Sequence, residues 1–208
     1  WHDHMTFGVA NHYDGTATPG VLPEVAAQVV LLDPNDIDGV AEAFERDPEI
    51  AAVILEPTGG GGGMIPLAPG FVSQLRALTE EHGVLLIMDE VVTGFRVHPG
   101  GAQGLFEVTP DLTTLAKILA GGLPGGAVAG RAEILDHLDF RAAADRQFEK
   151  IHHPGTFNAN PMSAAAGTKT LEIIADSDAC ARAAAFGEAL RPRLNEGFAR
   201  AGVAWAAY

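Results

Sequence analysis

The chain has 208 residues, 47% of them hydrophobic and 19% charged, which is enough for a sizeable core and one domain, with room for a piece of another. Its 13 basic and 27 acidic residues give a formal net charge of −14, which disfavours nucleic acid and membrane surfaces as partners. Cys180 is the only cysteine, which excludes an internal disulfide and a cysteine metal cluster and fits a reducing, cytoplasmic setting.

The first half of the chain alternates helical and strand patterns. Ile37, Val40 and Phe44 recur at helical spacing, and Asn35 or Asp36 can cap that helix. Short apolar runs with β-branched residues indicate buried strands. In chain order we expect a loop over 1–23, a helix over 35–46, a strand over 51–55, a helix over 71–82 ending at Gly83, and a strand over 84–88.

The second half predicts one more strand and longer helices. Asn160 can cap a helix that has Pro161 at its favoured first position. Pro192 should kink or break the last helix. In chain order we expect a segment around a lysine over 111–119, a strand over 126–130, a brief helix over 132–138, a helix over 161–175 and an alanine-rich helix over 178–201.

Strands that alternate with amphipathic helices predict an α/β fold with a mainly parallel sheet. Ligands of such sheets bind beyond the carboxyl ends of the strands. Three acidic residues, Glu56, Asp89 and Glu90, directly follow or end the predicted strands. We therefore expect the functional site at this edge of the sheet.

Asp89 and Lys117 carry the most chemical information. Asp89 follows five apolar residues, so its carboxylate must reach solvent or a partner. Lys117 lies in an apolar, glycine-flanked segment, which predicts a buried amine. A carboxylate that holds a pyridine nitrogen protonated and an amine that forms a Schiff base are what pyridoxal 5′-phosphate (PLP) requires. Taken singly, Asp89 is better explained as a loop or helix-cap residue and Lys117 as a surface lysine.

Three separated motifs carry a resemblance to a known family. They are Asp89-Glu90-Val91-Val92-Thr93-Gly94-Phe95-Arg96, the segment from Pro110 to Lys117 with the glycines that follow, and the segment from His153 to Pro161. In this order they resemble the class III aminotransferases, and among these most of all the glutamate-1-semialdehyde 2,1-aminomutases and their relatives. Glu56-Pro57 with the segments 59–64 and 69–71 also follows that pattern, so the resemblance covers most of the chain.

The resemblance implies the large domain of a fold type I PLP-dependent transferase and a role for each matching residue. Asp89 would pair with the pyridine nitrogen, and Val91 would pack on one face of the ring. Lys117 would bind the cofactor covalently and then move a proton between the substrate and the cofactor. Thr156 would donate a hydrogen bond to the cofactor phosphate of the neighbouring subunit, which implies a homodimer. Glu56 would either approach the ring substituents or simply end its strand.

The resemblance also predicts how the chain is divided. Residues 1–175 would form the PLP-binding large domain, incomplete at its N-terminus, and residues 176–208 a connecting helix and the start of a small C-terminal domain. The chain begins at Trp1 instead of a methionine and ends without a polar tail at Tyr208. We therefore expect a piece of a longer protein, poorly stable and inactive by itself, whereas the full-length protein is expected to be an active enzyme.

The remaining motifs of the sequence indicate no further catalytic or metal site. The glycine run after Thr58 lacks the Gly-Lys-Ser/Thr ending of a phosphate-binding P-loop and predicts a flexible connection. Glu90 and Arg96 are expected to pair with each other or with nearby backbone. The eight histidines show no His-Glu-x-x-His spacing, and we expect no metal site. No Gly-x-Ser-x-Gly motif supports a hydrolase.

The residues leave the reaction itself open. An aminomutase returns the amino group to the neighbouring carbon of the same small amino substrate, whereas a transaminase releases a keto product. Racemisation or epimerisation would use the same aspartate and lysine. A non-catalytic remnant that keeps the fold is a further alternative, although such a remnant has no physical need for Asp89 or Lys117.

Overall fold

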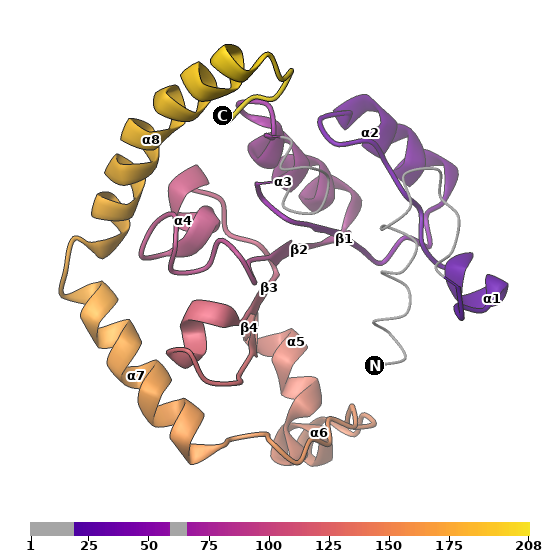
Figure 1. Cartoon of the computed structure of the whole chain (residues 1–208). Helices are drawn as coiled ribbons and strands as arrows, with labels where there is room; N and C mark the ends of the chain where they lie inside the picture. Colours follow the sequence, from indigo (N-terminus) through magenta and orange to yellow (C-terminus); the bar gives the residue numbers. More distant parts are fainter. Residues whose placement is uncertain (1–18, 59–65) are drawn as a thin grey trace.

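The computed structural model describes residues 19–58 and 66–208 (Figure 1). Most of the predicted loop over 1–23 and the glycine run 59–63 lie outside the described residues. The centre of the molecule is a four-stranded sheet in which the strands follow their order in the chain. Its strands are β1 (Ala52–Leu55), β2 (Leu85–Asp89), β3 (Leu112–Leu115) and β4 (Ala127–Gly130).

The sheet is mainly parallel, as predicted. Strands β1, β2 and β3 run parallel, and only β4 is antiparallel to its neighbour β3. Between β2 and β3 the register pairs Met88 with Thr113 and Asp89 with Thr114. The carboxyl ends of the three parallel strands therefore lie side by side at one edge of the sheet.

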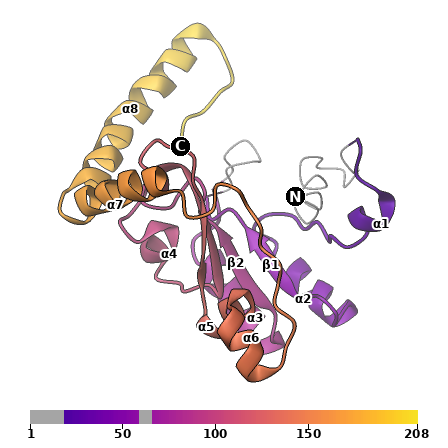
Figure 2. The same cartoon turned by 90° about the horizontal axis from the view of Figure 1, so that it is seen from below.

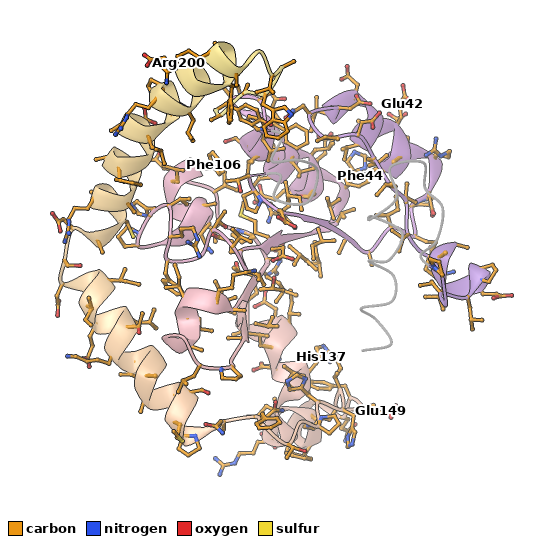
Figure 3. The ribbon with its side chains drawn as sticks, viewed as in Figure 1. Glu42, Phe44, Phe106, His137, Glu149 and Arg200 are labelled. Atoms are coloured by element: carbon orange, nitrogen blue, oxygen red, sulfur yellow. The ribbon has the colours of Figure 1, made fainter. Side chains whose placement is uncertain are left out.

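The hydrophobic core lies between one face of the sheet and the two helices that precede β1 and β2. Leu86 and Met88 are two residues apart on β2, so their side chains lie on the same face of the sheet, and both are fully buried. They pack with residues of α2 (Ile37–Arg46) and α3 (Phe71–His82). In Figure 3, Phe44 lies on the inner side of α2, while Glu42 of the same helix points away from the core. The amphipathic spacing read from the sequence thus predicted the buried face of α2 correctly.

Both of these helices begin and end where the sequence predicted. The side chain of Asp36 accepts a hydrogen bond from the backbone N–H of Gly39 and so caps the start of α2. Helix α3 ends at Gly83, whose φ of 68° is the left-handed conformation that glycine adopts without strain.

Several short helices were not predicted. Helix α4 contains two glycines, and its low helix propensity explains why the sequence did not predict it. The remaining helices are α1 (Pro23–Ala26), α4 (Gly101–Phe106), the 3-10 helix η2 (Lys117–Ala120), α5 (Ala132–Leu135), the 3-10 helix η3 (Asp136–Leu138), α6 (Phe140–Arg146), α7 (Pro161–Ala175) and α8 (Ala179–Ala201). Of these, α1, α4 and α6 are the ones that the sequence analysis missed.

Of the two predicted effects of Pro192, a kink or a break, the break is wrong, because helix α8 continues through this residue. Proline lacks the N–H that would bond to the carbonyl of Glu188, so one helical hydrogen bond is lost. The helix projects away from the sheet in Figure 2, and Cys180 is its one buried residue. Because the helix is so exposed, water can reach the freed carbonyl, and the proline is tolerated. Within the described ranges, no helix is long and apolar enough to span a membrane.

Asp111 ties three elements together at the amino end of β3. Its carboxylate is buried and accepts hydrogen bonds from the backbone N–H of Leu86 (2.8 Å), from Arg76 of α3 (2.8 Å) and from Arg131 (2.9 Å). Burial raises the pKa of this carboxyl, but the hydrogen bond from Leu86 and those from Arg131 and Arg76 outweigh it and lower the pKa from 3.8 to about 2. The ionised form of Asp111 therefore stabilises the fold.

We expect Asp111→Asn to lower the free energy of unfolding by about 2 kcal/mol at neutral pH. The pKa is lowered on folding, so this contribution is present above pH 3.8 and is lost as the pH falls toward about 2. Urea unfolding of both proteins across this pH range measures the difference, which should shrink with acidification. Glu133→Gln is the control, because Glu133 is an exposed partner of the same Arg131 and its replacement should change stability far less than that of Asp111.

Candidate functional site

Three residues predicted from the sequence lie at the same edge of the sheet. Glu56 directly follows β1, Asp89 is the last residue of β2, and Lys117 lies two residues beyond β3. The backbone N–H of Glu90 donates to the carbonyl of Thr114 (3.0 Å), so the pairing of β2 and β3 continues to their carboxyl ends. Asp89 and Lys117 are therefore brought to the ends of adjacent parallel strands, where α/β sheets bind ligands.

The Asp89 carboxylate is half-buried and turned back onto its own loop. Its Oδ1 accepts a hydrogen bond from the backbone N–H of Val91 (3.0 Å), the bond of an Asx turn. This bond fixes the carboxylate relative to Val91, which is itself half-buried. Within the described ranges no other hydrogen bond or ion pair reaches Asp89, so one carboxylate oxygen stays available to a ligand.

Thr114 is a site residue that the sequence analysis did not single out. It pairs with Asp89 in the parallel register, so both side chains lie on the same face of the sheet. Its hydroxyl Oγ1 is buried and has no hydrogen-bond partner among the described residues. An unpaired buried hydroxyl costs about 1–3 kcal/mol, which favours a polar partner at this place. Its only signal in the sequence is that it is a polar residue in the segment that precedes Lys117.

Lys117 does not occupy the buried setting that its apolar neighbours predicted. The side chain is exposed, whereas Ile118 and Leu119 beside it are half-buried. A 3-10 turn begins at Lys117, whose φ is 48°, so the apolar residues of the segment pack inward while the lysine lies at the open edge. The expectation of a buried amine is thus wrong for the chain described here.

The lysine turn is held in place by helix α7, which lies beside it in Figure 1. The hydroxyl of Ser163 donates to the carbonyl of Pro124 (2.6 Å). Gly121 has a φ of 63°, and a Cβ there would lie 2.6 Å from the carbonyl oxygen of Ala166. A Cβ on Gly167 would lie 2.5 Å from the carbonyl oxygen of Leu119. Both glycines permit this close approach of two backbones.

We expect Gly167→Ala to displace the lysine turn from α7 and to lower stability by about 1–3 kcal/mol. Gly187→Ala is the matched control, because Gly187 also lies within a helix but has nothing within 4 Å of its Cβ position. The control should raise stability by up to about 1 kcal/mol, since alanine favours helix. Thermal unfolding of both variants measures the contrast, and equal effects would show that the contact with the Leu119 carbonyl is not restrictive.

Thr156 and Glu56 are less closely tied to this edge. Thr156 is exposed in the loop between α6 and α7, and among the described residues no hydrogen bond joins it to Asp89 or Lys117. Glu56 is half-buried and is followed by the buried Pro57. Its carboxylate makes no hydrogen bond or ion pair within the described ranges. Position alone therefore relates Glu56 to the site.

Glu90 and Arg96 do not pair with each other. Arg96 donates from Nε to the carbonyl of Val92 (2.8 Å), and the Glu90 carboxylate binds loop donors instead. In the part of the chain that the structure describes, no cluster of three histidine, cysteine or acidic side chains could hold a metal ion.

A cavity of about 360 Å³ lies near β3 and β4 and has Gln103, Thr113, Leu115 and Arg131 in its lining. Thr113 and Leu115 alternate with Thr114 along β3, so they face away from the side of the sheet that carries Asp89. The cavity is therefore separate from the edge where the predicted residues meet.

Comparison with known proteins identifies the family of the chain. The model of the family "Aminotransferase class-III" matches residues 25–203. Glutamate-1-semialdehyde 2,1-aminomutase of Alkaliphilus metalliredigens is 44% identical over 171 residues, which are 82% of this chain and 36% of the relative. Glutamate-1-semialdehyde 2,1-aminomutase 2 of Brevibacillus brevis is 42% identical over 206 residues, 96% of this chain and 46% of the relative. The chain thus spans less than half the length of these relatives.

Solved structures of transaminases share the fold of this chain. An omega-transaminase from Sphaerobacter thermophilus superposes with a TM-score of 0.77 at 38% identity, covering 91% of this chain and 43% of that one. A transaminase with PLP bound superposes with a TM-score of 0.80 at 30% identity, covering 92% and 44%. With the family model matching most of its length, this chain belongs to the class III aminotransferase family.

Proposed function

We propose that this protein transfers an amino group between an amino compound and an aldehyde or ketone, with PLP as its cofactor, in the manner of a glutamate-1-semialdehyde aminomutase. The observation that carries the proposal is the register of β2 and β3, which brings Asp89 and Lys117 to the ends of neighbouring parallel strands. The aminomutases at 42–44% identity favour this chemistry over racemisation.

The residues at this edge fit the cofactor. Asp89 has one carboxylate oxygen free of hydrogen bonds from the described residues, and the hydroxyl of Thr114 beside it is buried and unpaired. The Lys117 amine is exposed and has no partner within the described ranges. An acceptor for a protonated ring nitrogen and a free amine for an aldehyde are both present.

When bound, PLP withdraws electrons from the bond that breaks at the amino-bearing carbon of the substrate. Asp89 would hold the proton on the pyridine nitrogen, and its bond to the Val91 N–H would keep the carboxylate oriented. Val91 would pack on the ring with a stiff, β-branched side chain. Lys117 would bind the cofactor and then take and return a proton at its Nζ atom.

Thr156 and Glu56 would also contact the cofactor, and the protein would act as a homodimer. Thr156 would donate its hydroxyl to the phosphate held by the partner subunit of a homodimer, and its exposure in a loop is compatible with that role. Glu56 would lie next to the ring substituents. A cytoplasmic location fits the single cysteine. Residues 1–175 would belong to the PLP-binding domain, and 176–208 would lead into a second one.

Borohydride reduction of the PLP-loaded full-length protein, followed by peptide mass spectrometry, tests the proposal. The chain has three lysines, so Lys150 and Lys169 are internal controls. The pyridoxyl group is expected on Lys117 alone. Labelling of either control lysine, or no labelling of the full-length protein, would contradict the proposed function. Analysis of the products from a chiral amino donor then separates amino transfer from racemisation.

A further inference from the structure

We propose that Glu90 is a positioning residue that fixes Asp89 relative to the strand that leads to Lys117. The inference rests on the proposed function and adds a role for a side chain that does not itself need to touch cofactor or substrate. It is carried by the burial of the Glu90 carboxylate, by its four hydrogen bonds and by the bridge that Gln103 makes to β3.

Glu90 is only 1% exposed, although it is charged. Its Oε2 accepts hydrogen bonds from the hydroxyl of Thr93 (2.9 Å) and the backbone N–H of Ala102 (2.5 Å). Its Oε1 accepts from Gln103, through the backbone N–H (3.1 Å) and through the side-chain Nε2 (2.9 Å). A carboxylate this deeply buried is tolerated only with such compensation, because within the described ranges no cation pairs with it.

All four donors belong to the segment that follows Glu90 in the chain, from Thr93 to Gln103. The carboxylate therefore closes this segment into a loop and holds the start of α4. Gly101, the first residue of α4, has a φ of 69°, and a Cβ there would collide with the Glu90 carboxylate. The backbone is thus shaped around this side chain.

Gln103 connects the closed loop to the neighbouring strand. The same Nε2 that donates to Glu90 also lies within hydrogen-bond distance of the hydroxyl of Thr113 (3.2 Å). Thr113 belongs to β3 and precedes Lys117 by four residues. One hydrogen-bonded chain therefore runs from the residue after Asp89 to the strand that carries the lysine turn.

This series of hydrogen bonds can hold Asp89 and Lys117 at a constant separation. Asp89 is covalently joined to Glu90, so a loop that slips away from β3 shifts the Asp89 carboxylate with it. Displacements of about 1 Å in a catalytic group can cost about 10²-fold in rate. A purely structural role predicts lost stability alone, whereas a positioning role predicts a change at the cofactor as well.

Glu90→Gln tests the proposal most sharply, because it keeps the size of the side chain but turns an amide NH₂ toward two of the four donors. In the PLP-loaded protein we expect kcat to fall about 10- to 100-fold with KM changed less than about 3-fold, and the visible circular dichroism of the bound PLP to change. In the PLP-free protein, amide hydrogen exchange across residues 91–103 should accelerate. Gln103→Leu should show the same effects to a smaller degree.

Asp111→Asn is the matched control. Asp111 is also a buried carboxylate that joins β2 to β3, but it lies at the opposite end of these strands. It should lower the unfolding temperature without altering kcat by more than about 2-fold, the circular dichroism of PLP or the exchange of residues 91–103. If Glu90→Gln behaves like this control, the positioning role is overturned. If the unsubstituted protein leaves Lys117 unlabelled, the proposed function fails instead, and the exchange experiment still decides whether Glu90 anchors the loop.

Discussion

Replacing Lys117 by alanine is expected to abolish amino transfer, with kcat reduced by at least about 10³-fold. The proposed role combines covalent binding of PLP with proton transfer at the substrate, and general acid–base catalysis alone contributes about 10²- to 10⁴-fold. Steady-state kinetics of the PLP-loaded variant measures the loss. The variant should fold as the unsubstituted protein does, because the Lys117 side chain is exposed and makes no hydrogen bond within the described ranges.

Lys169→Ala is the control for this loss. Lys169 is exposed on α7 and forms a surface ion pair with Glu172 (3.0 Å), which contributes little to stability. Its replacement should leave kcat unchanged within about 2-fold. If Lys117→Ala retains amino transfer and its thermal unfolding is unchanged, Lys117 takes no part in the reaction. That result would contradict the proposed function.

Replacing Asp89 by asparagine is expected to lower kcat by about 10²- to 10³-fold and to weaken PLP binding. The asparagine oxygen can still accept the hydrogen bond from Val91, so the turn is kept while the negative charge is lost. Without that charge the pyridine nitrogen is no longer held protonated, and the ring withdraws electrons less strongly. Kinetics with saturating PLP separates the loss of rate from the loss of cofactor.

Reconstitution with PLP methylated at the ring nitrogen isolates the role of charge. The methylated ring is permanently cationic, so it should recover part of the lost rate in Asp89→Asn. Asp111→Asn, which removes a buried carboxylate far from this edge, should show neither the loss nor the recovery. A rate for Asp89→Asn within about 3-fold of the unsubstituted protein would contradict the pairing of Asp89 with the ring.

The expected losses of rate in Lys117→Ala and Asp89→Asn both depend on the adjacency of the ends of β2 and β3. Asp89 and Thr114 pair directly, and Lys117 follows Thr114 by three residues. Each side chain alone is an ordinary residue at the end of a strand. Together they would supply an acceptor and an amine within the proposed PLP site.

Local patterns in the sequence predicted much of the fold. The apolar spacing in α2 and α3, the caps at Asp36 and Gly83, and Pro161 at the start of α7 act over a few residues each, and the structure has these elements where they were predicted. The apolar runs 51–55 and 84–88 became the parallel strands β1 and β2, and the run 126–130 became β4, which is antiparallel to β3; β3 itself was not predicted as a strand. Such signals survive because they depend on backbone geometry and nearby side chains alone.

The helices and contacts that were missed depend on neighbours far away in the chain. Helix α4 is poor in helix formers and is held by the carboxylate of Glu90, twelve residues before Ala102 in the chain. The hydroxyl of Thr114 became informative only once its burial and its lack of a partner were visible. None of these facts has a local sequence signature.

The sequence by itself determined the class of fold, the family resemblance and the residue types able to bind PLP, because these are written in short motifs and periodic patterns. Only the tertiary structure decided that Asp89 ends β2 beside the strand that leads to Lys117, that Lys117 lies exposed on a turn held by α7, and that Glu90 and Gln103 join the loop after β2 to β3. Register and burial are properties of strands and helices packed together, so no single segment of the chain contains them.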